Sequence, residues 1–136
     1  MKKSIYNILK ECSEPRSVKE RVQKLQQNGL PVVLQILKYA FDPNIKFLLP
    51  EGTPPYKPND FVDQEGILFS EARKIYLFVE GGNNNLTKFR REMLFIQFIE
   101  GLDKNDAILM CSVKDKKLPF KSLTADVVKQ AFPNIF

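Results

Sequence analysis

Hydrophobic residues recur every three to four positions along most of this chain, which is the spacing of helices that bury one face. The pattern is strongest over residues 86–101, where Leu86, Phe89, Met93 and Ile96 share one face and further apolar residues cover much of the rest. A helix that is apolar on nearly all sides must be enclosed by other elements. We therefore predict a central core helix at 86–101, capped by the three asparagines that precede it.

The same spacing predicts shorter helices before and after this one. Residues whose side chains can cap a helix start stand before four of them, at Ser4, Ser17, Asp103 and Thr124. The chain is therefore predicted to form a single all-α domain over residues 1–136, a compact bundle of six or seven helices. The other predicted helices span residues 4–12, 18–28, 31–41, 67–80, 104–113 and 125–132.

One long segment between the predicted helices is rich in proline. Residues 50–66 contain four prolines, which rule out a regular helix and disfavour a central strand. A loop of this length in a compact domain is either functional or held against the protein by its own side chains. We interpret it as packed, because Tyr56 and Phe61 can anchor it to the core.

The composition of the 136 residues is that of a globular protein, and it excludes several kinds of chemistry. Histidine, the commonest general base and metal ligand, is absent, and the two separated cysteines do not form a zinc motif. The chain also lacks the motifs of phosphate-loop, dinucleotide-binding, zinc-protease and serine-hydrolase sites. We therefore expect no catalytic activity, no cofactor and no metal.

Acidic residues gather in and beside the proline-rich loop, at Glu51, Asp60, Asp63 and Glu65. Carboxylate clusters can bind metal ions, but this spacing lacks the glycine and the alternation of a calcium-binding loop. We interpret these residues as solvated loop charges. No apolar run is long enough to span a membrane, and the N-terminus lacks the apolar core of a signal peptide, so we expect an intracellular protein without a membrane partner.

The net charge of +5 is unevenly distributed, because the middle of the chain is acidic and both ends are basic. In the connector before the last predicted helix, Lys114, Lys116, Lys117 and Lys121 lie within eight residues. Lysines at a helix C-terminus also complement the helix dipole, which requires no ligand. Here, however, they stand beside the N-terminus of the last helix at residues 122–124, where free backbone N–H groups can bind phosphate.

A second basic cluster consists of Lys88, Arg90 and Arg91, at the start of the 86–101 helix. These residues either extend the same surface or form the solvated end of a core helix. Phosphate contacts require only positive charge and hydrogen-bond donors, and they give affinity without sequence specificity. The two clusters together are the DNA-binding residues that we predict.

The C-terminal segment resembles the end of the helical N-terminal DNA-binding domain of ATP-dependent DNA ligases. In that family a helix runs into a basic connector, and a short helix then ends in a Pro-Gly tail. The matching pieces here are Lys114–Asp115, the connector up to Ser122, and Ala131–Ile135, with Asn134 in place of the tail glycine. The ligase lysine motif KxDG does not occur, so the resemblance implies a free-standing relative of a DNA-binding module and not a ligase.

Over nearly its full length the chain resembles a family of small uncharacterised proteins of T-even-like phages, including cyanophages. The matching segments are KYAFDPNIKFLLPEGTPPYKP at 38–58, GGNNNLT at 81–87 and KDKKLPFK at 114–121. This resemblance brings no established activity with it. It implies a protein that works in the cytoplasm of a phage-infected bacterial host.

Two functions fit these observations. The first is a non-catalytic phage accessory protein that binds duplex DNA, mainly through phosphates. The alternative is a protein-interaction module without nucleic-acid binding, which would contact a host or phage replication, transcription or virion protein. Its contact surfaces would be the proline-rich loop with Tyr56 and Phe61, and the apolar tail at residues 132–136.

Overall fold

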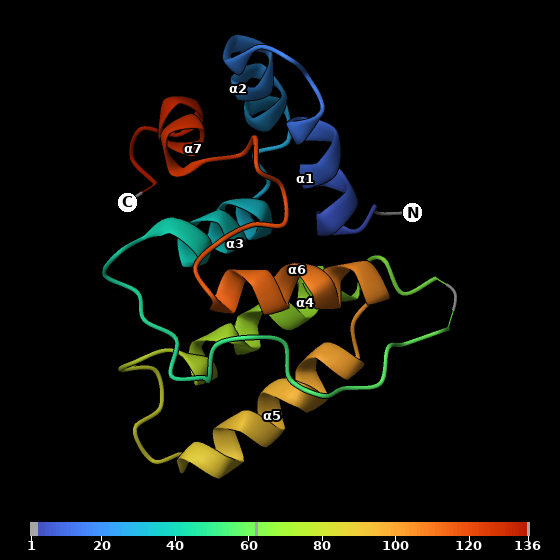
Figure 1. Ribbon diagram of the computed structural model, residues 1–136, viewed down its shortest axis with the longest axis vertical. Helices are drawn as coiled ribbons and strands as arrows, with labels where there is room; N and C mark the ends of the chain where they lie inside the picture. Colours follow the sequence, from blue (N-terminus) through green and yellow to red (C-terminus); the bar gives the residue numbers. More distant parts are fainter. Residues whose placement is uncertain (1–2, 62, 136) are drawn as a thin grey trace.

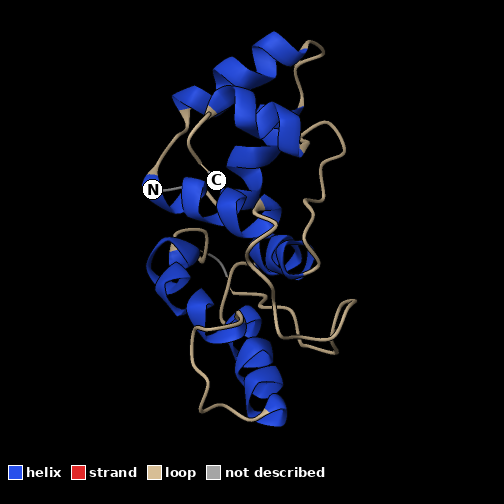
Figure 2. Cartoon of the chain, turned by 90° about the vertical axis from the view of Figure 1, so that its left-hand side faces the viewer, coloured by secondary structure: helices blue, strands red, loops and turns tan. Residues whose placement is uncertain are grey.

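The computed structural model describes residues 3–61 and 63–135, and these residues form seven α-helices and one 3-10 helix. Figure 2 shows helices joined by loops, without a strand in the described part of the chain. An isolated antiparallel bridge pairs Phe47 with Val79. The all-α prediction is confirmed. The helices are α1 (Ile5–Ser13), α2 (Val18–Gln27), α3 (Pro31–Phe41), α4 (Ile67–Glu71), the 3-10 helix η1 (Ala72–Phe78), α5 (Lys88–Glu100), α6 (Lys104–Lys114) and α7 (Ala125–Ala131).

Side-chain caps determine where four of these helices begin, as the sequence predicts. The hydroxyl of Ser4 accepts a hydrogen bond from the Asn7 N–H, and Ser17, Asp103 and Thr124 cap α2, α6 and α7 in the same way. Each bond satisfies an N–H group that has no partner inside the helix, and replacing such a cap with alanine typically costs about 1 kcal/mol. These four starting points are therefore encoded locally.

The start of α5 differs from the prediction, because Thr87 and not the asparagine run caps this helix. The Thr87 hydroxyl accepts a hydrogen bond from the Arg90 N–H at 3.1 Å. The Asn83 side chain instead accepts from the Asn85 N–H, within the turn before the helix. Lys88 is therefore the first helical residue, and the basic cluster fills the first turn of α5.

The helices are arranged along the long axis of the molecule (Figure 1). α1, α2 and α7 lie together at one end, where α2 packs against both of the others. α3 and α6 form the middle, and α5 lies at the opposite end. A single cluster of buried apolar residues connects these parts, and it includes Leu9, Ile36, Phe78 and Leu109.

The centre of the bundle is α6, one helix later than predicted. α6 packs against α1, α3 and α5, and seven of its eleven residues are buried. α5 packs mainly against α6 and η1, through Phe95 and Phe98, whose rings contact Phe78. Its remaining face carries the exposed Phe89 and Met93. The apolar pattern of this segment predicted an enclosed helix, but the fold leaves one stripe of α5 uncovered.

The predicted helix at 67–80 divides into α4 and η1 at Ala72. The Ala72 carbonyl accepts a hydrogen bond from the Gln35 side chain at 3.3 Å, which competes with an α-helical bond at this point. The chain then continues in the tighter 3-10 conformation to Phe78 and becomes extended.

Candidate nucleic-acid interface

The predicted basic connector contains two lysines whose ammonium groups bond to the protein itself, Lys114 and Lys116, and two exposed ones. The side chain of Lys114 is only 2% exposed, and its ammonium group donates to the Pro50 carbonyl at 2.9 Å and to the Asp115 carboxylate at 2.7 Å. Asp115 in turn accepts a hydrogen bond from the Gly52 N–H at 3.1 Å. Lys114 therefore ties the end of α6 to the proline-rich loop and is enclosed by the protein.

Lys116 is also directed into the protein. Its backbone lies in the left-handed region with φ of 64°, and the N–H groups of this residue and the next close α6 in a Schellman motif. Glycine is usual at such a position because it has no Cβ. Here the side chain has a role, since its ammonium group donates to the carbonyls of Tyr39 at 2.6 Å and Asp42 at 2.8 Å, at the end of α3. Burial lowers the pKa of Lys116 from its ordinary value, although the Asp42 carboxylate acts in the opposite direction.

We call Lys114, Asp115 and Lys116 the clasp, because they join α6 to α3 and to the proline-rich loop. The predicted DNA-binding cluster of four lysines is corrected accordingly, because Lys114 and Lys116 bind internal carbonyls, which need donors where helix ends are buried. Lys117 and Lys121 are exposed, and in the described part of the chain neither forms an ion pair.

The start of α7, which the sequence suggested as a phosphate site, uses its polar groups for internal contacts. The Thr124 hydroxyl accepts from the Val127 N–H at 3.3 Å, and Asp126 places a negative charge in the first turn. The Ser122 hydroxyl donates to the Ser13 carbonyl at 2.8 Å, which holds the connector against α1. A helix start with its own cap and its own carboxylate has little attraction for a phosphate.

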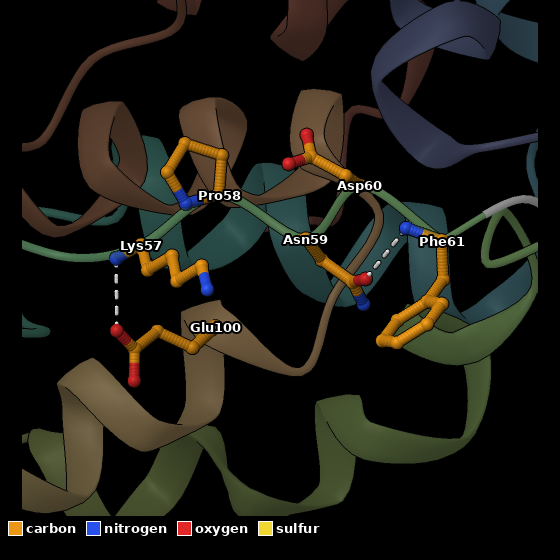
Figure 3. A pocket seen from close by; sticks show the side chains of 6 residues that line it. All are labelled: Lys57, Pro58, Asn59, Asp60, Phe61 and Glu100. Carbon is orange, nitrogen blue, oxygen red and sulfur yellow. Dashed lines mark hydrogen bonds between the residues drawn. The ribbon is translucent and has the colours of Figure 1, made fainter.

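The proline-rich loop is packed onto the protein, although only one of its two aromatic anchors is used. Tyr56 packs against the core, and the Lys57 N–H donates to the Glu100 carboxylate at 2.8 Å. Phe61 is 81% exposed. Figure 3 shows Lys57, Phe61 and Glu100 around a shallow hollow of about 440 Å³. The acidic residues of the loop do not gather as metal ligands, and no such group is found among the described residues.

The C-terminal tail, the other predicted protein-contact surface, is largely folded back on the bundle. Phe132 and Ile135 pack against the core, and the Phe132 ring lies beside Gly29. The Gln26 side chain donates to the Ala131 carbonyl at 3.2 Å, which fixes the end of α7 to α2. The final residue of this predicted surface, position 136, lies outside the described residues.

The second predicted cluster has a different environment. We call Lys88, Phe89, Arg90 and Arg91 the α5 tip. Lys88 and Arg90 are exposed, whereas Arg91 is only 8% exposed. The Arg91 Nη2 donates to the Leu86 carbonyl at 3.1 Å, and its buried Nε has no hydrogen-bond partner. Within residues 3–61 and 63–135, none of these three cations forms an ion pair.

The α5 tip opposes the dipole of its own helix. The N-terminus of a helix carries partial positive charge and favours anions, and α2, α6 and α7 have an acidic residue in the first turn. The first turn of α5 has none, and three of the first four helical residues are cations. A charge of the wrong sign at this position typically costs about 0.3–1 kcal/mol. The arrangement therefore favours the approach of an anion.

Positive charge is distributed differently at the two ends of the molecule. Residues 3–30 and 118–136, which contain α1, α2 and α7, have eight Lys or Arg and four Asp or Glu. Residues 31–117 have twelve of each. The α5 tip is therefore a local concentration of positive charge on a neutral part of the chain, and α5 lies at the opposite end of the molecule from α1, α2 and α7 (Figure 1).

Asp106 is a buried ionisable residue that is not among the site residues predicted from the sequence. Its Oδ1 accepts a hydrogen bond from the Tyr6 N–H at 2.8 Å, so that a residue of α6 caps the start of α1. The other carboxyl oxygen is buried without a partner. Burial raises the pKa of Asp106 to about 7, with small contributions from the carboxylates of Asp103 and Glu65 and against the effect of the Tyr6 N–H. No local signal identifies this residue, because its partner lies 100 positions away.

The geometry thus defines an all-helical protein with a group of cations in the first turn of α5. The chain belongs to a family of unknown function, DUF6433, whose sequence model matches residues 8–119. This match includes the clasp and the α5 tip but not α7. Comparison with curated proteins and with solved structures finds no match. No helix among the described residues is both long enough and apolar enough to cross a membrane.

Proposed function

We propose that this protein is a non-catalytic accessory protein that binds duplex DNA through phosphate contacts. The observation that carries the proposal is the α5 tip, where three cations stand in the first turn of a helix without an acidic partner. Phosphate groups of DNA supply the negative charge that this turn lacks, and helix N-termini bind phosphates through free N–H groups.

The contacts differ from those that the sequence alone suggested. Lys88 and Arg90 would contact phosphates directly, because their side chains are exposed, and the largely buried Arg91 would add to the local positive potential. Lys117 and Lys121 are exposed and remain secondary candidates, whereas the clasp lysines have a structural role. The resemblance to phage proteins would place this activity in the cytoplasm of an infected bacterial host.

The experiment compares three double substitutions, each of which removes two positive charges. Lys88→Ala with Arg90→Ala changes the α5 tip, Lys117→Ala with Lys121→Ala changes the connector, and Lys19→Ala with Lys24→Ala changes exposed residues of α2. Binding of each variant to a fluorescent duplex is measured by anisotropy over a range of salt concentrations. Because net charge falls equally in all three, a difference between them reports a site and not overall attraction.

We expect the α5 tip variant to bind most weakly. Its plot of log affinity against log salt should become shallower by about two units, since each lost phosphate contact contributes roughly 0.9. Equal weakening of all three variants would indicate attraction without a site. If the parent protein shows no salt-dependent binding to duplex DNA, the proposal is wrong.

One observation favours the alternative, a protein-interaction module. Phe61 is 81% exposed on a loop that is otherwise held in place, and an exposed aromatic residue on a fixed scaffold is a common anchor for a protein partner. In that case a partner recovered from infected cells should survive nuclease treatment. Phe61→Ser should abolish its recovery, and the double substitution at the α5 tip should leave it unchanged.

A further inference from the structure

Phe89, at the centre of the α5 tip, is an aromatic residue without a structural role in the described part of the molecule. It is 73% exposed and stands between Lys88 and Arg90, which are exposed as well. Burying a phenylalanine side chain normally stabilises a protein substantially, so this ring contributes little to the core. Met93 follows one turn later on the same face and is 37% exposed, so that the apolar surface continues along the helix.

Beneath Phe89, the start of the helix retains unused hydrogen-bond donors. Of the first three helical N–H groups, that of Arg90 donates to the Thr87 hydroxyl, and those of Lys88 and Phe89 have no acceptor among the described residues. The Arg91 guanidinium reaches back to the Leu86 carbonyl, and so it points toward the turn that begins the helix. Its Nε, on a side chain that is more than nine-tenths buried, donates to nothing.

Two kinds of group therefore lie together on the α5 tip: a flat apolar ring, and donors and cations on either side of it. Nucleic acid presents the complementary pair, because each base has an apolar face and each base is flanked by phosphates. In an intact duplex the base faces are covered by stacking, so that the ring would find only groove edges or backbone. An unpaired base exposes its face to the ring while its two phosphates remain within the reach of the cations.

We propose that the α5 tip binds an unpaired nucleotide, with Phe89 stacked on the base and Lys88 and Arg90 on the flanking phosphates. This inference rests on the proposed function and adds a preference to it, for gapped or single-stranded DNA over an intact duplex. The cations serve all DNA substrates alike, whereas the ring distinguishes those with an unpaired base. The apolar stripe alone would also suit a protein partner, but three cations in a first turn without an acid, none of them in an ion pair among the described residues, favour a polyanion.

The experiment uses three labelled DNAs of one sequence: an intact duplex, the same duplex with a gap of a few nucleotides, and the single strand. The parent is compared with Phe89→Ala, with Phe89→Trp, and with Met93→Ala as a matched control on the same face. We expect Phe89→Ala to bind the gapped and single-stranded DNA about 10-fold more weakly, within the usual range for one stacked base. Its affinity for the intact duplex should be unchanged, and Met93→Ala should resemble the parent.

Phe89→Trp supplies a direct readout, because the chain contains no other tryptophan. This variant should retain the preference for unpaired DNA, and its emission should be quenched by the single strand and not by the intact duplex. The variants should unfold at the same temperature as the parent, since an exposed ring is being changed.

The two proposals fail in different ways. If the parent binds no DNA, or binds without salt dependence, the proposed function is wrong and this inference falls with it. If the parent binds DNA and Phe89→Ala leaves all three affinities unchanged, or lowers them equally, only the stacking inference is overturned. Recovery of a protein partner that depends on Phe89, without any DNA binding, would overturn both and assign the α5 tip to a protein interface.

Discussion

The clasp and the α5 tip are both short basic segments at the end of a helix, but they occupy opposite ends with respect to helix polarity. The clasp lies where α6 ends, close to the end of α3, and carbonyl oxygens are available there as acceptors for ammonium groups. The α5 tip lies where a helix begins and only N–H donors are free. The cations of the clasp bind acceptors of the protein itself. At the α5 tip only Arg91 does so, through the Leu86 carbonyl, whereas Lys88 and Arg90 are exposed and form no ion pair among the described residues.

This difference offers a rule for separating structural lysines from residues that attract a ligand. A basic cluster after a helix satisfies carbonyls and complements the dipole, so its presence needs no external anion. A basic cluster in the first turn opposes the dipole and competes with the local donors. The second arrangement is the less stable one, and it is therefore the better indication of a binding site.

The largest test of this comparison is the removal of the clasp cation. Lys114→Met keeps the length of the side chain but leaves the Asp115 carboxylate and the Pro50 carbonyl without their partner. Breaking a buried ion pair in this way typically costs about 3 kcal/mol. Equilibrium urea unfolding should show this loss, while Lys117→Met, at the exposed neighbour, should change the free energy of unfolding by less than about 0.5 kcal/mol. If the two variants have equal free energies of unfolding, Lys114 does not have the structural role assigned to it.

Asp106 extends the comparison to a negative charge in the first turn of a helix. Its charge complements the dipole of α6, but one of its two carboxyl oxygens is buried without a hydrogen-bond partner. Its pKa is about 7 in the folded protein, against 3.8 for an ordinary aspartate. Between these values the folded protein binds more protons than the unfolded chain, so stability falls as pH rises from about 4 to about 7 and is level above that. We expect a loss of about 2 kcal/mol over this range, smaller than the full shift because the site can relax.

Asp106→Asn tests this account, because it keeps an acceptor for the Tyr6 N–H and cannot ionise. Its free energy of unfolding should change less with pH between 4 and 8 than that of the parent, and it should exceed the parent value at pH 8. Urea unfolding of both proteins at several pH values measures this difference in the free energy of unfolding. An unchanged pH dependence in the variant would mean that other groups cause it.

A smaller effect is expected at Lys116, where backbone strain and side-chain bonds act in opposite directions. Lys116→Ala loses the bonds to Tyr39 and Asp42 and keeps the left-handed backbone, at a cost of about 1.5 kcal/mol. Lys116→Gly loses the same bonds but relieves about 1 kcal/mol of strain, so it should cost only about 0.5 kcal/mol. The order of the two midpoints in urea is the measurement. A glycine variant less stable than the alanine variant would contradict the assignment of strain to this residue.

The parts of this fold that could be predicted are those encoded by neighbouring residues. The caps at Ser4 and Thr124 act three positions away in sequence. The apolar spacing identifies all seven predicted helical segments, although the segment at 67–80 divides into α4 and η1. The environment of the clasp could not be predicted in this way, because Lys114 meets a carbonyl 64 positions earlier. Lys114 and Lys121 look alike in the sequence, and only the path of the proline-rich loop makes one of them internal.

The start of α5 illustrates the limit at short range. Three consecutive asparagines and Thr87 are all competent caps, and the structure uses the threonine. With the predicted start at Leu86, only Lys88 would lie in the first turn, and Arg90 and Arg91 would lie in the second, farther from the positive end of the dipole. Because α5 begins at Lys88 instead, all three cations lie in its first turn, and this turn is the candidate site.

The smallest expected change bears most directly on the rule itself. Lys88→Glu replaces a cation with an anion at the first position of α5, so it should stabilise the protein by about 0.5 kcal/mol through the helix dipole. Lys104→Glu makes the same change at the first position of α6, where Lys104 is also exposed. Both variants should gain similar stability in urea unfolding, and the gain should shrink in high salt.

Only one of the two should lose affinity for DNA. If α5 retains a cation at a destabilising position because that position binds phosphate, Lys88→Glu gains stability and loses binding, whereas Lys104→Glu gains stability and binds as the parent does. If both variants lose the same affinity for DNA, the loss is caused by the change in net charge and not by a site at α5. A stabilised Lys88→Glu variant with unchanged affinity would show that the basic first turn of α5 is tolerated by the fold and not used for DNA.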